Sequence, residues 1–291
     1  MNKAFKIFSP FKKLPIGPNS WAITGAKILS MIMFVFLRYF LKYRHKVILA
    51  NLTKAFPSKN KRELRHLTLS YYHHMSDLFV EPFLFYCVSD SQRRKLASYT
   101  NKGLLQRLYR DNKQVVLLAS HYGNWEYLTN LPQVAGYDVY SAFSPVKNRH
   151  IDKMMFKMRS FLGVTLIPRK HFYRKALSLL QQVGTPKMIL LIADQRPAPG
   201  SSKYHLPFLD QDTKVQIGGE RMAVSSDAAV VYIESEKTSR FHYNFTFRMI
   251  SEKAANAVPM EITKSYFGNL EKTINHSPAY WLWSHNRWRQ S

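Results

Sequence analysis

The residues that could most readily do chemistry are a histidine and a glutamate five positions apart. Residues 115–128 read VVLLASHYGNWEYL, so an apolar run that is typical of a strand is followed by His121 and then by Glu126. In one continuous helix, two residues at this spacing point about 140° apart, and the two side chains would not meet. The pair can act together only if the chain turns between them.

We expect the strand to stop at Ser120 and the chain to turn, so that Asn124 caps a helix whose first turn carries Glu126. The glutamate could then reach back to His121. A carboxylate on one imidazole nitrogen fixes the tautomer, and the other nitrogen can then remove a proton from an alcohol. The alternative is a histidine satisfied by a backbone carbonyl and a glutamate that only caps the helix.

The sequence beside this pair lacks the G-x-S-x-G pattern of a serine nucleophile. A base without a protein nucleophile favours direct attack by a bound hydroxyl on an activated acyl group.

Strand and helix patterns alternate from about residue 114 to 194, which predicts an α/β fold with a mostly parallel central sheet flanked by helices. Reactive groups in such sheets lie beyond the carboxyl ends of the strands. His121 directly follows a predicted strand, and Asp194 lies at the end of another. The expected strands are 114–120, 137–143, 164–168, 187–194, 228–235 and 241–250, and the expected helices include 61–86, 101–112, 124–136, 149–163, 172–184 and 260–278.

The charge balance is strongly basic, with 43 Lys and Arg against 18 Asp and Glu and a formal net charge of +25. Such a field attracts nucleic acid, anionic lipid headgroups or an acidic carrier protein. The single cysteine, Cys87, excludes an internal disulfide, and its aromatic neighbours predict a buried, inert thiol.

The N-terminal segment, residues 1–45, is predicted to contain a membrane-associated helix. Its uncharged core, residues 28–37, is shorter than the ~20 apolar residues that span a bilayer. Both flanks are basic, which favours a helix lying in the interface over a single span. A core helix of the remaining domain, residues 46–291, is the alternative. The basic residues that precede the helix are Lys3, Lys6, Lys12 and Lys13, followed by the break LPIGPNS.

Four sequence blocks together resemble one enzyme family. They resemble motifs of the bacterial lipid A late acyltransferases. The blocks are SHYGNWE at a strand end, YRHKVILANLTKAFP, LIADQRPAPGSSKYHLPFLDQDTKVQIGGERMA and YWLWSHNRWR. These are related to the glycerolipid acyltransferases with an H-x4-[DE] motif. The resemblance covers residues 40–291. It departs from the family at LPFLDQD and at Lys214, which affects the acyl and headgroup pockets.

The resemblance implies acyl transfer from an acyl thioester, usually acyl carrier protein, to a hydroxyl of a lipid acceptor at the cytoplasmic face of the inner membrane. His121 would be the general base, helped by Glu126, with no covalent intermediate and no metal or other cofactor. We expect an anionic membrane surface and no nucleic acid among the partners. The residues expected to bind substrate are Asn124, Arg169, Arg174, Asp194 and Gln195.

Within this expectation the oxyanion of the reaction needs a stabilising group. Backbone N–H groups at Gly123 and Asn124 could serve, as could Arg169, which matches an arginine of the family, or Arg174. Asp194 matches the aspartate of the family's D-Q pair and could position that arginine or the acceptor.

Two further patterns have alternative interpretations. His73, Asp77 and Glu81 share one helix face and could ligate a metal, or could form surface pairs. The aromatic and basic tail WLWSHNRWRQ could stack on single-stranded nucleic acid, anchor at lipid headgroups, or pack onto the sheet.

Overall fold

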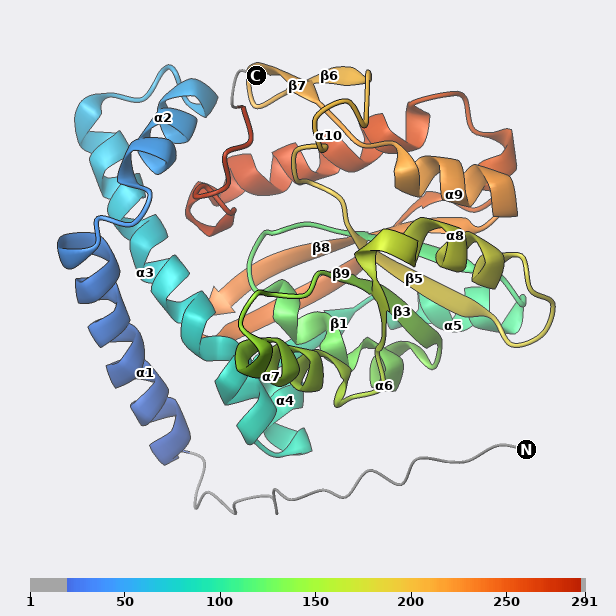
Figure 1. Ribbon diagram of the computed structural model, residues 1–291, viewed down its shortest axis with the longest axis horizontal. Coiled ribbons are helices and arrows are strands. Elements are labelled where there is room, and N and C mark those ends of the chain that lie inside the picture. Colours follow the sequence, from blue (N-terminus) through green and yellow to red (C-terminus); the bar gives the residue numbers. More distant parts are fainter. Residues whose placement is uncertain (1–19, 289–291) are drawn as a thin grey trace.

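The computed structural model describes residues 20–288 and has a seven-stranded sheet between two layers of helices (Figure 1). The strand order is β1-β9-β8-β2-β5-β3-β4, and every neighbouring pair is parallel except β8 and β9. This confirms the predicted α/β class and its mostly parallel sheet. The strands are β1 (Ala97–Thr100), β2 (Val115–Ala119), β3 (Asp138–Phe143), β4 (Thr165–Pro168), β5 (Lys187–Ile192), β8 (Ala229–Ser239) and β9 (His242–Ser251).

Strand β2 lies near the middle of the sheet because all five of its side chains are apolar and all are buried. Alternate residues enter different cores: Val116 and Leu118 join one cluster, and Val115 and Leu117 join the other. A strand with both faces covered is expected to be a continuous apolar run, as this one is. Its register with β5 places Ala119 opposite Ile192, so the residues that follow the two strands emerge side by side.

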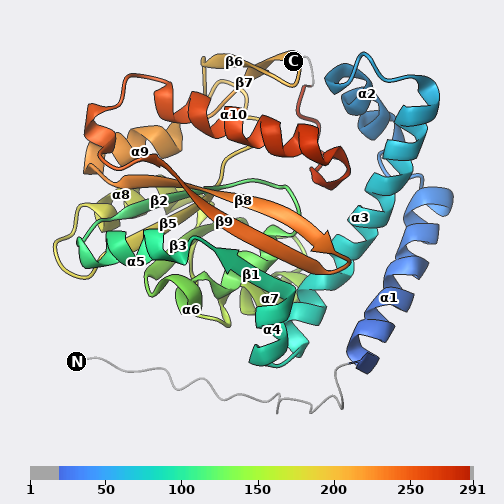
Figure 2. The same cartoon turned by 180° about the vertical axis from the view of Figure 1, so that it is seen from behind.

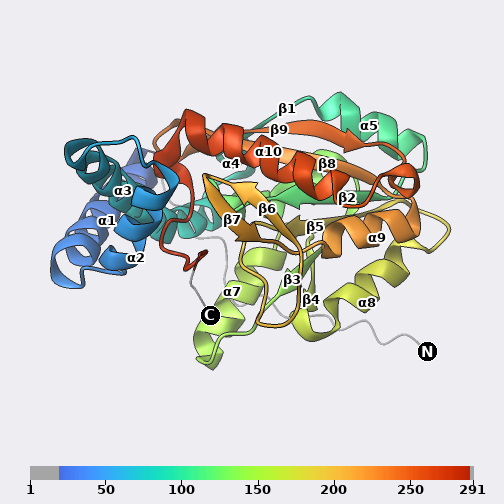
Figure 3. The ribbon, with the colours of Figure 1, turned by 90° about the horizontal axis from the view of Figure 1, so that it is seen from above.

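Helices α8, α9 and α10 cover one face of the sheet, and α5 and α6 cover the other (Figures 1 and 3). A short two-stranded hairpin, β6 (His205–Phe208) with β7 (Gln211–Lys214), lies beside α10. The helices are α2 (His45–Ala55), α3 (Lys61–Cys87), α4 (Asp90–Leu96), α5 (Lys102–Arg110), α6 (Leu131–Ala135), α7 (Arg149–Ser160), α8 (Arg169–Leu180), α9 (Gly218–Ser226) and α10 (Glu261–His276). Short 3-10 helices are η2 (Trp125–Asn130), η3 (Ala254–Asn256) and η4 (Pro278–Tyr280).

The N-terminal helix α1 (Ser20–Val35) continues as a π-helical turn, η1 (Phe36–Phe40), and packs against α3 (Figure 2). Ala26, Phe34 and Leu37 on its inner side are buried. Its outer side is apolar and exposed. The exposed large apolar residues are Trp21, Ile28, Leu29, Met31, Ile32, Val35, Phe36, Tyr39 and Phe40, and the charged residue Lys27 is exposed as well. Residues Trp21–Phe40 form a helix long and apolar enough to cross a membrane, and only 22% of its most apolar window is buried.

The basic residues Lys3, Lys6, Lys12 and Lys13, the LPIGPN part of the break and Arg289 lie outside the described residues. The predicted division of the chain after residue 45 stays a prediction. Sequence patterns did not identify β1, the β6–β7 hairpin, α2, α4 or α9. The predicted helix at residues 124–136 begins as the 3-10 helix η2 before α6, and it ends as expected at Gly136, which has a φ of 72°.

Two glycines with similar backbone angles provide a test of packing around the turn after β2. Gly123 (φ +63°) lies so close to its neighbours that an added Cβ would meet Ser235 Oγ at 2.4 Å, whereas Gly136 (φ +72°) has nothing within 4 Å. Gly136→Ala should cost only the left-handed strain, roughly 1–2 kcal/mol of unfolding free energy. Gly123→Ala should cost about 1–3 kcal/mol more because of overpacking. Urea unfolding followed by circular dichroism measures both, and equal midpoints would contradict the packing argument.

Candidate active site

The chain turns sharply after β2, as the sequence predicts, and the C-terminal segment holds this turn. The Gly123 N–H donates to the Tyr280 carbonyl at 2.9 Å, and the Tyr122 hydroxyl donates to the Ser277 carbonyl at 2.9 Å. The sequence makes the Gly123 N–H a candidate donor to an oxyanion. It is not free for that role, because it already donates to Tyr280. Asn124 Oδ1 accepts from the Glu126 N–H at 3.0 Å, which confirms the predicted cap.

The imidazole of His121 is bound to a buried carboxylate from the neighbouring strand end. His121 Nδ1 lies 2.6 Å from Asp194 Oδ1, and the His121 backbone N–H donates to Asp194 Oδ2 at 2.9 Å. The indole N–H of Trp281 donates to the same Oδ2 at 2.8 Å. Asp194 is only 1% exposed. The parallel register of β2 and β5 therefore forms a His–Asp pair whose geometry three donors fix.

The electrostatics of the pair keep Asp194 ionised. Burial alone would raise the pKa of Asp194, but the charge of His121 and the hydrogen bonds from His121 and Trp281 outweigh burial, so that the pKa is lowered. An ionised Asp194 makes Nδ1 of His121 the protonated nitrogen. Nε2 then carries the lone pair, and it lies 3.0 Å from the side-chain amide of Gln195. The ring of Trp125 contacts the imidazole edge to face, with centroids 4.6 Å apart.

Glu126 does not contact His121 as predicted, because its carboxylate is bound to another residue. Glu126 instead forms a two-pronged ion pair with Arg159 of α7: Arg159 Nε donates to Glu126 Oε2 at 2.8 Å, and Arg159 Nη2 donates to Oε1. The turn does bring Glu126 into the first turn of η2, but the Nδ1 position is occupied by Asp194. The carboxylate that orients the histidine comes from 73 residues along the chain rather than five.

The other predicted substrate-binding residues differ in exposure. Asn124 is 0% exposed, and its amide nitrogen donates to Glu81 Oε2 at 2.7 Å. Gln195 is exposed and contacts His121, as described above. Arg169 and Arg174 lie exposed on α8, with no side-chain partner among residues 20–288. Arg169 follows the end of β4, at the edge of the sheet where β2 and β5 also end.

The aromatic tail packs into the fold, which agrees with one of the three interpretations of its sequence. Trp281 is 2% exposed and Trp283 is 0% exposed, and Trp288 donates to Thr213 Oγ1 at 2.7 Å. Burial, together with the charge of His121, lowers the pKa of His285 to about 4. The sequence reasoning did not identify Trp281 as a partner of Asp194. The available signal was the indole N–H of Trp281, a hydrogen-bond donor that needs an acceptor once it is buried, in a tail that contains no acidic residue.

The possible metal ligands on α3 serve other purposes. His73 stacks on Phe34 with centroids 3.7 Å apart, and the carboxylate of Asp77 is bound by Lys237 and Arg240. Within residues 20–288 no cluster of three His, Cys, Asp or Glu side chains could hold a metal ion. Cys87, predicted to be buried, is exposed: it is the last residue of α3, and of its aromatic neighbours only Phe85 is buried.

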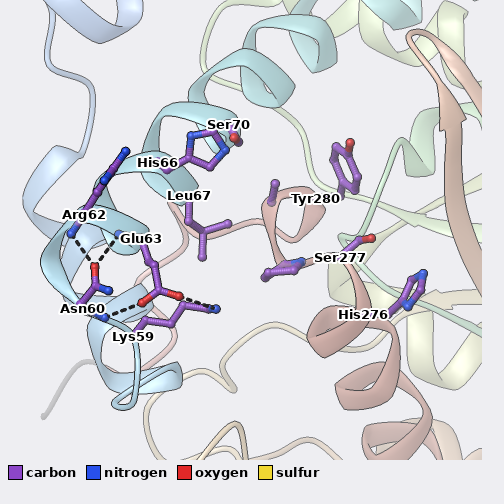
Figure 4. Close-up of a pocket in the computed structure, with 12 residues that line it drawn as sticks. Lys59, Asn60, Arg62, Glu63, His66, Leu67, Ser70, His276, Ser277 and Tyr280 are labelled. Atoms are coloured by element: carbon purple, nitrogen blue, oxygen red, sulfur yellow. Dashed lines mark hydrogen bonds and ion pairs between the residues drawn. The ribbon is translucent and has the colours of Figure 1, made fainter.

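A cavity of about 650 Å³ lies between the first half of α3 and the α10–η4 segment (Figure 4). Basic, hydroxyl, amide, acidic and apolar side chains all line it: Lys59, Asn60, Arg62, Glu63, His66, Leu67, Ser70, His276, Ser277, Pro278, Ala279 and Tyr280. His121 does not line it. Ser277 and Tyr280 line the cavity and also accept the hydrogen bonds from the His121 turn, so the cavity is behind this turn.

A histidine that a buried carboxylate orients at the end of a strand can act as a general base. A family model described as bacterial lipid A biosynthesis acyltransferase matches residues 16–290, nearly the whole chain. The chain therefore belongs to the bacterial lipid A biosynthesis acyltransferase family, and the predicted resemblance is confirmed. A search of curated proteins found no match.

The Glu126–Arg159 pair can be tested by removing its cation. Arg159→Leu leaves the Glu126 carboxylate, whose side chain is 13% exposed, without a partner. Because Arg159 is itself 30% exposed, we expect a loss of only about 1–3 kcal/mol in unfolding free energy. Adding Glu126→Gln should restore part of that loss. Urea midpoints of the two variants measure this, and a single variant as stable as the unmodified protein would show that the pair contributes nothing.

Proposed function

We propose that this acyltransferase moves a fatty acyl group from the thioester of acyl carrier protein to a hydroxyl of a lipid A precursor, at the cytoplasmic face of the inner membrane. The proposal rests above all on the His121–Asp194 pair, which leaves one basic nitrogen directed at an exposed side chain, Gln195.

The geometry supports His121 as the general base. Asp194 accepts the Nδ1–H, so Nε2 can take the proton of an acceptor hydroxyl that replaces the Gln195 amide. The hydroxyl oxygen then attacks the thioester carbonyl, and a tetrahedral oxyanion forms. When the carbon–sulfur bond breaks, the imidazolium returns its proton to the departing thiolate. Asp194 stabilises the imidazolium between these steps.

Three arginines are candidates to stabilise the oxyanion. Arg169 begins α8 directly after β4, which is three strands from β2 and so roughly 14 Å from it across the sheet. Its long side chain can span part of that distance. Arg159 is held by Glu126, next to the Trp125 ring that contacts His121. We therefore assign Glu126 the task of positioning Arg159, and we retain Arg174 as the alternative to Arg169.

Membrane association is supported by α1 and by the charge of the chain. The exposed side of α1 is almost entirely apolar, and Lys42, Arg44 and Lys46 follow it closely. Apolar side chains next to basic ones suit an anionic bilayer surface. The net charge of +25 also favours an acidic donor carrier.

Substitutions at the site should distinguish the roles of the two carboxylates. With acyl carrier protein as donor and a lipid A precursor as acceptor, His121→Ala should lower kcat by about 10³-fold or more. Asp194→Asn should lower it by roughly 100-fold or more, because the amide no longer fixes the imidazole. Glu126→Gln should lower it by about tenfold or less.

Thin-layer chromatography of labelled lipid measures this transfer, and acyl coenzyme A as a parallel donor identifies the carrier. Wild-type turnover in His121→Ala would exclude the mechanism. A larger loss in Glu126→Gln than in Asp194→Asn would assign the orienting role to Glu126 instead.

The exposed side of α1 provides a separate test. Ile28→Asp combined with Ile32→Asp should weaken binding to anionic vesicles by about tenfold or more, because two apolar side chains no longer enter the bilayer. Val183→Asp, on the α8–β5 connection and 100% exposed, is the matched control and should bind as the unmodified protein does. Vesicle sedimentation measures both. Equal losses in the two variants would indicate that α1 has no special role.

A further inference from the structure

Two acidic side chains that the proposed reaction does not use are buried together on α3. Asp77 is 5% exposed and Glu81 is 0% exposed. Glu81 accepts from the Asn124 amide at 2.7 Å and from the Tyr243 hydroxyl at 2.9 Å. Lys237 Nζ lies 2.9 Å from Asp77 and 3.8 Å from Glu81, and so joins the two carboxylates.

The network extends to α1, which lies beside α3 in Figure 2, and on the other side to the turn after β2. Ser30 of α1 donates to Asp77 Oδ1 at 2.7 Å. At the other end, Asn124 is three residues after His121, and its Oδ1 caps the helix that carries Glu126. Both ends of the Asn124 amide are therefore engaged, one by Glu81 and one by the Glu126 N–H.

The turn between these groups has little freedom to move. Gly123 lies against β8 and β9, because an added Cβ would meet Ser235 Oγ at 2.4 Å and the Tyr243 ring at 3.1 Å. The same Tyr243 donates to Glu81. Glu81 therefore holds the turn at two points: it accepts from the Asn124 amide, and it binds Tyr243, whose ring packs against Gly123.

Burying an acid here costs stability. The pKa of Glu81 is raised from its ordinary value of 4.5 to about 7: burial is the largest cause and the charge of Asp77 adds to it, while Lys237, Asn124 and Tyr243 oppose the rise. Tyr127 of η2 also faces this charge. The folded protein thus binds more protons than the unfolded chain between pH 4.5 and about 7, and its stability falls as the pH rises through that window. An apolar or neutral residue would be cheaper to bury.

We propose that Glu81 is a positioning residue of the acyltransferase site: its carboxylate holds the Asn124 amide and so fixes the turn that presents His121. This inference rests on the proposed function. On this proposal the Glu81 carboxylate stays in the interior because it fixes the geometry of the turn. The stability of the fold does not depend on this charge.

The test is Glu81→Gln, a neutral side chain of nearly the same shape. Its kcat should fall by roughly ten- to a hundredfold with little change in KM, because a displaced base slows the reaction more than it weakens binding. Its melting temperature at pH 8 should be equal to or above that of the unmodified protein, because the ionised acid no longer has to be buried. Asn124→Ala should show the same kcat loss, and the double variant should be no slower than either single variant.

The pH profile gives a second readout. In the unmodified protein, kcat/KM should fall as the pH drops through about 7, because protonation of the Glu81 carboxylate weakens its hold on the Asn124 amide. Glu81→Gln and Asn124→Ala should both show a shallower fall over the same pH range, because Glu81 no longer acts through Asn124 in either variant. If Glu81→Gln does not fold, the Asn124→Ala profile decides.

Glu220→Gln is the matched control. Glu220 is another buried acid, 7% exposed, but it binds the start of α10 through the Met260 and Thr263 N–H groups. We expect it to lose stability and keep its kcat. A Glu81→Gln variant with normal kcat, or one that loses kcat only as it loses stability, overturns the positioning role. An unmodified protein that transfers no acyl group from either donor would instead overturn the proposed function.

Discussion

One buried charge determines how the site is put together. Asp194 is nearly inaccessible to solvent, and an ionised carboxylate at such a position is stable only if donors surround it. His121 supplies two of them, its ring and its backbone N–H, and Trp281 supplies the third. Three segments far apart in sequence, the end of β2, the end of β5 and the tail, must therefore meet at one point.

That requirement explains why the C-terminal segment is part of the core. The Tyr280 carbonyl accepts from Gly123, the Trp281 indole reaches Asp194, and the Arg287 guanidinium donates to the Lys214 carbonyl at 2.8 Å. These contacts connect the tail to the histidine turn, the acid and the β6–β7 hairpin. The arrangement of the site is thus completed only by the last described residues of the chain.

Much of the fold could be predicted from the sequence because its signals are local. The apolar run of β2, the periodicity of α3 and the left-handed cap at Gly136 each depend on neighbouring residues alone. The partner of His121 could not be predicted in the same way. Glu126 is close in sequence and Asp194 is not, and only the pairing of β2 with β5 decides between them. Short elements such as β1 and the β6–β7 hairpin also lack a pattern long enough to recognise.

The hydrogen bond between Ser30 and Asp77 has a consequence for how the protein meets a lipid surface. If α1 were a flexible tether that left the body when it entered a bilayer, Asp77 would lose a donor, and the stacked pair of Phe34 and His73 would separate. Helix α1 is thus fixed to the body of the protein and is not a flexible tether. If α1 enters a bilayer as proposed, its contacts with α3 would set the angle and depth of the His121 site relative to the lipids.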